Sequence, residues 1–258
     1  SRGLGDVYKR QGYTQTITSP STPAVLTSNP LPKTDVQDVT LKNETSGLTG
    51  ENKGIHITAD KPIVAYAHIY NTSVSGVTLL YPTNILGKTY YSINYNQSSN
   101  EDMSNAWFYT IATDTGTTYV RITPSANTIN HAAGIPFVVS LQRGQIYNIM
   151  GQLTGGSNLS YTGVDLTGSK IESIAVGNTP AKNIAVFSGS GKLNITCGSS
   201  ISSADNYMVQ SFPKEMWGKQ FLTVPTAVMI NNYFRICLSD STSVVKVNGV
   251  TITSSPIN

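Results

Sequence analysis

Short segments with apolar residues at alternating positions recur along the chain, and they predict β-strands. Ile55, Ile57 and Ala59 alternate with polar residues, which is the pattern of a strand with one buried face. Residues 63–69 are apolar or aromatic almost throughout, so we expect that strand to be covered on both faces. Further strand-length segments follow every 8 to 12 residues or so with turn residues between them. This spacing predicts an all-β sandwich.

Turn chemistry between these segments predicts how they are joined. Asp114-Thr115-Gly116 combines an aspartate that bonds its own backbone with a glycine suited to positive φ, so we expect residues 108–112 and 117–122 to form a β-hairpin. The same reasoning predicts a second hairpin over residues 137–150 and a turn at residues 188–191. No segment keeps a helical period for three turns, and the best helical candidate is a single turn at residues 205–210.

The order of these elements occurs twice. Each copy has a strand that begins with glycine, then a proline followed five residues later by Gly-Lys, then a strand that ends in an aspartate turn. The first copy has these features at Gly54, Pro82 with Gly87, and Asp114, and the second has them at Gly168, Pro213 with Gly218, and Asp240. Matching features lie roughly 115 to 131 residues apart. The period is longer than that of solenoid or propeller repeats and matches a small β domain. We therefore predict tandem β-sandwich-like units related by internal duplication, with both proline–glycine segments acting as fold determinants.

Composition excludes several kinds of partner. Only 12% of the residues are charged, about half the usual share, and the net charge is +3. The basic residues form no stripe of the kind that nucleic acid needs. No apolar run reaches the ~18 residues of a membrane span. The two cysteines, Cys197 and Cys237, are either a disulfide or two buried thiols.

No residue pattern indicates catalysis. The Gly87-Lys88-Thr89 segment lacks the earlier glycine of a phosphate-binding loop, since residue 82 is a proline without an N–H group. The acidic residues form no glycosidase pair, and the histidines form no triad or metal cluster. We predict no enzyme activity, no cofactor and no metal.

Aromatic residues supply the candidate binding site, which we place at Tyr91, Tyr95 and Trp107. Tyrosine-rich surfaces give contact area at a low entropic cost. The alternative interpretation is that these rings pack against one another across strands. Because exposed hydroxyls, amides and rings outnumber charges, we expect recognition of an extracellular glycoprotein, mucin-like protein or polysaccharide.

Several of these segments together resemble the N-terminal domain of the IgGFc-binding protein family. The resemblance covers most of residues 12–258 and rests on residues 53–63, 80–88, 144–150, 165–171, 184–189, 217–219 and 234–236. The family occurs in a mucus-associated animal protein and in large bacterial surface or secreted proteins. The resemblance implies an extracellular or cell-surface binding or adhesion role, but it assigns no immunoglobulin-binding residues.

The predicted organisation has three parts. Residues 1–11 resemble translated adapter sequence and are a non-native leader, residues 12–197 hold the first β unit or units, and residues 198–258 hold a truncated second copy. We expect the chain to be a metagenome-derived fragment of a longer multidomain bacterial protein. A structural spacer of a large surface protein and a secreted glycan-acting enzyme are the alternatives to a binding module.

Overall fold

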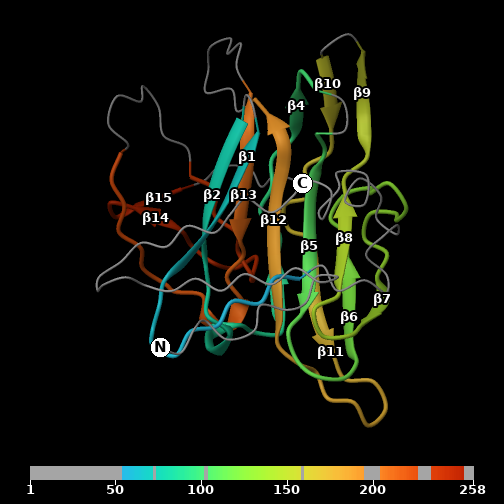
Figure 1. Cartoon of the computed structure of the whole chain (residues 1–258). Helices are drawn as coiled ribbons and strands as arrows, with labels where there is room; N and C mark the ends of the chain where they lie inside the picture. The colour runs from blue at the N-terminus through green and yellow to red at the C-terminus, as the bar shows by residue number, and fades with distance from the viewer. Residues whose placement is uncertain are drawn as a thin grey trace.

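The computed structural model describes residues 54–71, 74–101, 104–157, 160–194, 204–225 and 234–252, and nearly all regular structure in them is β (Figure 1). The predicted all-β class is confirmed. Short 3-10 turns, η2 (Thr83–Ile85) and η3 (Lys214–Met216), are the helical elements of these ranges. None of the described helices has the length and apolar character that crossing a membrane requires. The predicted leader, the unit boundary at residues 197 and 198, and Cys197 lie outside the described residues.

Two four-stranded antiparallel sheets face each other and form a sandwich (Figure 1). In sheet A the strand order is β13 (Asp205–Gln210), β12 (Ile184–Leu193), β5 (Ala106–Ala112) and β8 (Ile146–Met150). In sheet B it is β3 (Thr89–Tyr91), β11 (Lys170–Ile174), β6 (Thr118–Thr123) and β7 (Phe137–Leu141).

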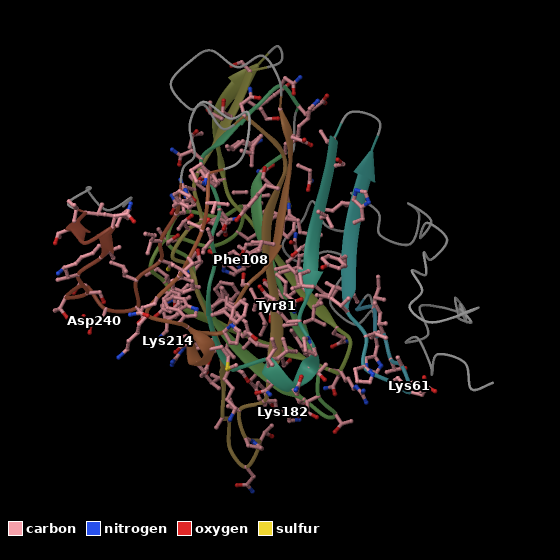
Figure 2. The ribbon with its side chains drawn as sticks, turned by 90° about the vertical axis from the view of Figure 1, so that its left-hand side faces the viewer. Lys61, Tyr81, Phe108, Lys182, Lys214 and Asp240 are labelled. Atoms are coloured by element: carbon pink, nitrogen blue, oxygen red, sulfur yellow. The ribbon has the colours of Figure 1, made fainter. Side chains whose placement is uncertain are left out.

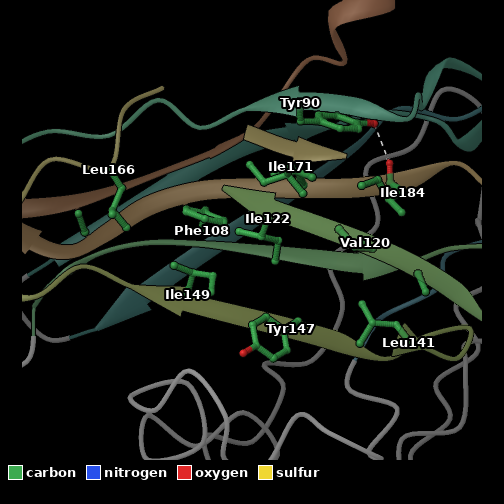
Figure 3. Packing of buried hydrophobic residues seen from close by; sticks show 13 residues of the cluster. Tyr90, Phe108, Val120, Ile122, Leu141, Tyr147, Ile149, Leu166, Ile171 and Ile184 are labelled. Atoms are coloured by element: carbon green, nitrogen blue, oxygen red, sulfur yellow. Dashed lines mark hydrogen bonds between the residues drawn. The ribbon is translucent and has the colours of Figure 1, made fainter. Parts of the chain in front are cut away.

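The core lies between the two sheets, and it is formed by the buried residues that alternate with more exposed residues along the strands. In β5 the even-numbered residues are buried and the odd-numbered ones are half-buried on the opposite face. Phe108 and Ile149 of sheet A thus meet Ile122 and Ile171 of sheet B, all four without solvent exposure (Figure 3). Tyr90 closes this core, and its hydroxyl donates a 2.6 Å hydrogen bond to the carbonyl of Ile184.

The two predicted hairpins are wrong, although the turns between their strands are present. Gly116 has φ +70° and the Thr115 N–H bonds the Asp114 carboxylate at 2.9 Å, so the chain does reverse there. However, β5 pairs with β12 and β8 in sheet A, whereas β6 pairs with β11 and β7 in sheet B. In the same way β7 and β8 enter different sheets. Each turn therefore carries the chain from one layer of the sandwich to the other.

Two further predictions fail in sheet A. Residues 205–210 are strand β13 and not a helical turn. Residues 188–191 lie within β12 and not at a turn, and the register with β13 shifts between Ser190 and Leu193.

A two-stranded ribbon, β1 (Ala65–Asn71) with β2 (Val74–Leu80), extends sheet A beyond β13. Side chains join β2 to β13: the Ser75 N–H bonds the Asp205 carboxylate at 2.9 Å, and the Gln210 N–H bonds the Thr78 hydroxyl at 3.0 Å. In the turned view of Figure 2 the ribbon, in teal, stands at one side of the molecule. The expectation that residues 63–69 are covered on both faces is wrong, because the Tyr66 side chain is 64% exposed within the described structure.

Smaller elements complete the described chain. One three-stranded sheet has the order β4 (Gln97–Ser99), β10 (Ser160–Gly163), β9 (Leu153–Ser157), and one hairpin pairs β14 (Lys246–Val247) with β15 (Val250–Thr251). Asn248 and Gly249 both have positive φ, which is the turn that a two-residue hairpin needs. Cys237 is half-buried, and burial raises the pKa of its thiol.

The two proline–glycine segments have the same local conformation and touch each other. Pro82 precedes the 3-10 turn η2 and has φ −64° and ψ 150°. Pro213 precedes η3 and has φ −65° and ψ 145°. A Cβ atom on Gly87 would lie 2.5 Å from the Pro213 Cβ, so glycine is needed for this close approach. Around Gly218 the nearest atom would be 3.4 Å away, which is an ordinary contact. The internal duplication itself stays a prediction.

Candidate binding surface

Tyr91 lies on the outer face of sheet B and meets a tryptophan from the other end of the chain. In β3 the side chain of Tyr90 points into the core, so that of Tyr91 points outward. Trp217 directly follows η3, and its ring centroid is 5.6 Å from that of Tyr91 with a 48° angle between the planes. Both side chains are half-buried, so each keeps part of its ring accessible. Among the described residues the Tyr91 hydroxyl has no hydrogen-bond partner. We call Tyr91 and Trp217 the aromatic pair.

A carboxylate clamp holds Trp217 in this position. Glu215 accepts hydrogen bonds from the backbone N–H groups of Lys88 and Thr89 at 3.2 and 3.1 Å, which ties η3 to the start of β3. The indole N–H of Trp217 donates to the carbonyl of Phe212 at 3.2 Å. The aromatic pair is therefore fixed by contacts on both sides and does not depend on ring contact alone.

Charged side chains lie beside the aromatic pair on the same face. Lys170, the register partner of Tyr91, bonds Glu172 at 2.7 Å, and Arg121 bonds the same carboxylate at 3.0 Å. Burial opposes ionisation of Glu172, but the hydrogen bonds and charges of Lys170 and Arg121 outweigh it, so its pKa is lowered. Two positive charges share one carboxylate, so this face carries one unbalanced positive charge together with oriented donors and an aromatic edge.

Tyr95 lies elsewhere, in a cluster around a guanidinium group. The Arg235 Cζ atom is 3.8 Å from the centre of the Tyr95 ring, and its Nη1 donates to the Asp165 carboxylate and the Thr167 hydroxyl. Tyr207 meets the Tyr95 ring edge-on at 5.9 Å, and burial raises the pKa of Tyr207 to about 12. Because the chain's own arginine covers one face of Tyr95, this ring offers a ligand less area than Tyr91 does.

Trp107 lies on the outer face of sheet A, in a row of stacked rings. Its ring centroid is 5.2 Å from that of Tyr109, which is in turn 5.1 Å from that of Phe187. A Cβ atom on Gly189 would come within 2.7 Å of the Trp107 ring, so the indole covers this glycine closely. This is the cross-strand packing that the sequence left as the alternative role for the aromatic residues.

The three predicted site residues thus lie in three places, and the structure does not bring them together. The residue that sequence reasoning missed is Trp217, which directly precedes Gly218 in the second proline–glycine segment. No local signal links Trp217 to Tyr91, because their contact depends on how η3 docks on β3. In the described ranges no group of three His, Cys, Asp or Glu side chains is placed to hold a metal ion.

Comparison with known proteins identifies one family. A family model described as IgGFc binding protein matches residues 76–258, which is well over half of the chain. No curated protein and no solved structure gives a significant match. The family is one of extracellular binding domains rather than of enzymes. The matched range contains both proline–glycine segments, sheets A and B, and the aromatic pair. The chain therefore belongs to the IgGFc binding protein family.

Proposed function

We propose that this chain is a non-catalytic extracellular binding module, and that the aromatic pair forms the centre of its ligand contact. The observation that carries the proposal is the placement of Tyr91 and Trp217, which lie 5.6 Å apart on the outer face of a rigid sheet. Family membership supports a binding role, and the ligand class is a glycoprotein, a mucin-like protein or a polysaccharide. The family name makes the Fc part of immunoglobulin G one ligand to test.

The chemistry of the surface fits a sugar-bearing or protein ligand. Tyrosine and tryptophan bury large areas and are the residues that most often dominate the energy of an interface. Glu172 is paired with both Lys170 and Arg121, so one positive charge is left unbalanced beside the two rings. Binding that depends mainly on the two rings should change only modestly in moderate salt, which screens charge–charge attraction but not ring contacts. Tyr95 and Trp107 remain secondary candidates.

The test is a binding screen followed by paired substitutions. The whole chain is passed over immobilised immunoglobulin G Fc, mucins and a panel of polysaccharides. For a ligand that binds, Tyr91→Ala and Trp217→Ala should each weaken the Kd by about tenfold or more, as expected for residues at the centre of an interface. Tyr119→Ala is the matched control, because Tyr119 is a half-buried tyrosine on the same sheet whose register partner, Ile174, lies at the opposite end of β11.

Each result decides between specific readings. Equal binding by all three variants would show that the ligand contacts another part of the molecule. Failure to bind anything in the panel would favour the structural-spacer alternative. Release of sugar fragments from a polysaccharide would favour the glycan-acting enzyme. Unfolding temperatures of the variants are compared first, so that a loss of binding is not mistaken for a loss of folding.

A further inference from the structure

Two basic side chains lie beside the aromatic pair, and both are more exposed than the carboxylate that they share. Lys170 and Arg121 bond Glu172 at 2.7 and 3.0 Å. Their side chains are 39% and 46% exposed, whereas that of Glu172 is 17% exposed. A ligand that approaches this face of sheet B therefore meets the ammonium and guanidinium groups before it meets the carboxylate.

Both cations keep hydrogen-bond donors that Glu172 does not use. The Lys170 ammonium carries three N–H donors and bonds Oε1 of Glu172 at 2.7 Å. Arg121 donates from Nε and Nη2 to Oε2 of the same carboxylate at 3.2 and 3.0 Å, which leaves Nη1 without a described partner. The donors and the unbalanced positive charge together suit one further anionic group.

The register of the strands sets how far these cations lie from the aromatic pair. Lys170 is the partner of Tyr91 on the neighbouring strand, and Arg121 lies one strand further, as the partner of Glu172. Neighbouring strands are about 4.8 Å apart, so Arg121 starts roughly 10 Å from β3. A sugar ring packed against the aromatic pair would cover the first gap, and a carboxylate attached to that ring would reach the cations.

Another carboxylate near the aromatic pair is already engaged. Glu215 accepts two backbone N–H groups at the start of β3, which holds η3 in place. Residues 214–219 contain two lysines and this one glutamate, so the segment that carries Trp217 adds no net negative charge. Glu215 therefore does not offset the excess positive charge around Glu172.

We propose that the aromatic pair binds a sugar ring that bears a carboxylate, such as a uronic or sialic acid unit, and that Lys170 and Arg121 receive that carboxylate. The inference rests on the proposed function and names the ligand class of the same surface. The planar donor fork of arginine matches a planar carboxylate. A single carboxylate also matches the one unbalanced positive charge, whereas a phosphate group brings close to two negative charges.

The test uses pairs of ligands that differ in their carboxylates. The whole chain is passed over a polyuronate and its methyl ester, and over a mucin before and after enzymatic removal of its sialic acids, at equal densities of immobilised sugar. Binding should be about fivefold or more tighter to the carboxylated member of at least one pair, and that pair identifies the sugar. Because this preference is electrostatic, it should shrink in moderate salt.

Substitutions in the charged group test which side chains give the preference. Lys170→Gln and Arg121→Gln should each lower it about two- to fivefold, as expected for one exposed ion pair, whereas Lys170→Arg should keep it. Glu172→Gln removes the competing carboxylate and should strengthen binding to the carboxylated ligand, which a purely structural role would not do. Lys61→Gln is the control, because it removes the same charge from an exposed lysine outside sheet B.

Three results would overturn the inference. The first is a parent chain that binds both members of each pair equally, or binds none of them. The second is a Glu172→Gln variant that binds the carboxylated ligand more weakly than the parent at an unchanged unfolding temperature. The third is binding to dextran sulfate or poly-glutamate, which carry charge without a carboxylated ring, as tight as to the preferred ligand.

The inference and the proposed function can fail separately. If Tyr91→Ala weakens binding but the two members of each pair bind equally, the aromatic pair is still the site and only the carboxylated ligand is wrong. If the preference for the carboxylated ligand is present but neither Tyr91→Ala nor Trp217→Ala weakens binding, the aromatic pair is not the centre of the site, and both proposals are wrong.

Discussion

Replacing Tyr90 by phenylalanine removes one oxygen atom from the core and leaves two backbone groups without their partner. The hydroxyl donates to the carbonyl of Ile184 at 2.6 Å and accepts from the N–H of Gly87 at 2.9 Å. Tyr90 and Ile184 have no solvent exposure, so water cannot replace the lost partner easily. A buried polar group left unsatisfied costs about 1–3 kcal/mol, so the two together should lower the free energy of unfolding by about 2–6 kcal/mol.

The neighbouring residue supplies a matched control. Tyr91→Phe removes the same atom from the next position of β3, where the side chain points outward and its hydroxyl bonds no described residue. That change should stay within about 0.5 kcal/mol, as surface substitutions usually do. Equilibrium unfolding in urea gives both values, and an unchanged slope against denaturant shows that the two variants unfold from the same state. A Tyr90→Phe variant as stable as Tyr91→Phe would refute the reasoning.

The same hydroxyl gives a pH signature. Burial, opposed by the bond from Gly87, raises the pKa of Tyr90 from 10.0 to about 12. Because the pKa in the folded state is the higher one, the stability that the protonated hydroxyl contributes is complete below pH 10.0 and is lost as pH rises through about 12. The stability difference between parent and Tyr90→Phe should therefore be constant at neutral pH and shrink near pH 12. Subtracting the variant cancels the titration of the other tyrosines.

Three further predictions concern single contacts. Gly87→Ala should destabilise the fold by about 1–3 kcal/mol because the new Cβ atom meets a packed neighbour, the side chain of Pro213. Gly218→Ala should change stability by less than about 0.5 kcal/mol. Thermal unfolding of both variants measures the difference, and equal losses of stability would contradict the prediction. Asp165→Asn should lower the free energy of unfolding, measured in denaturant, by about 2–4 kcal/mol, because it leaves the Arg235 guanidinium without its carboxylate in a mostly buried site. An unchanged free energy of unfolding would show that solvent replaces the carboxylate. Glu172→Gln should have its full effect above the ordinary glutamate pKa of 4.5, and the effect should disappear as pH falls from there through the lowered pKa of the folded state. The unfolding free energies of parent and variant should therefore converge in acid. A difference that stays constant down to low pH would contradict this.

The sequence predicts many of the strands, but the expected strand at residues 55–59 is wrong, because these residues belong to no strand of the structure. It predicts the partners of the strands less well. Period-two alternation identifies β5 and β6 because each strand buries one face, and the Asp114 turn is where the chain reverses. Turn residues fix only the local backbone, so they do not decide whether the next strand joins the same sheet or the opposite one. Both predicted hairpins failed for this reason. Residues 205–210 were misread because their alternation is weak, and tertiary pairing with β12 outweighs local preference.

The candidate site shows the same limit. Tyr91 could be nominated from the sequence because it lies in an aromatic-rich segment. Trp217 could not, since its place beside Tyr91 follows from Glu215 reaching the backbone of Lys88 and Thr89. Such contacts join residues that are far apart in the chain, and the local sequence around one residue does not indicate which distant residue it contacts.

The separation of β5 and β6 into different layers has a consequence for how this chain folds. Because β5 and β6 do not pair with each other, the chain has no local hairpin there to nucleate on. Strand β6 pairs with the next strand, β7, but the central strand β5 pairs with β8 and then, much later in the chain, with β12, where Tyr109 lies opposite Phe187. Pairing between such distant segments makes folding slow, since the loop between them must close before any contact is gained. During synthesis β5 therefore leaves the ribosome long before its partner and remains an apolar strand with one unpaired edge. Chaperones that hold extended apolar segments would act on it in that interval.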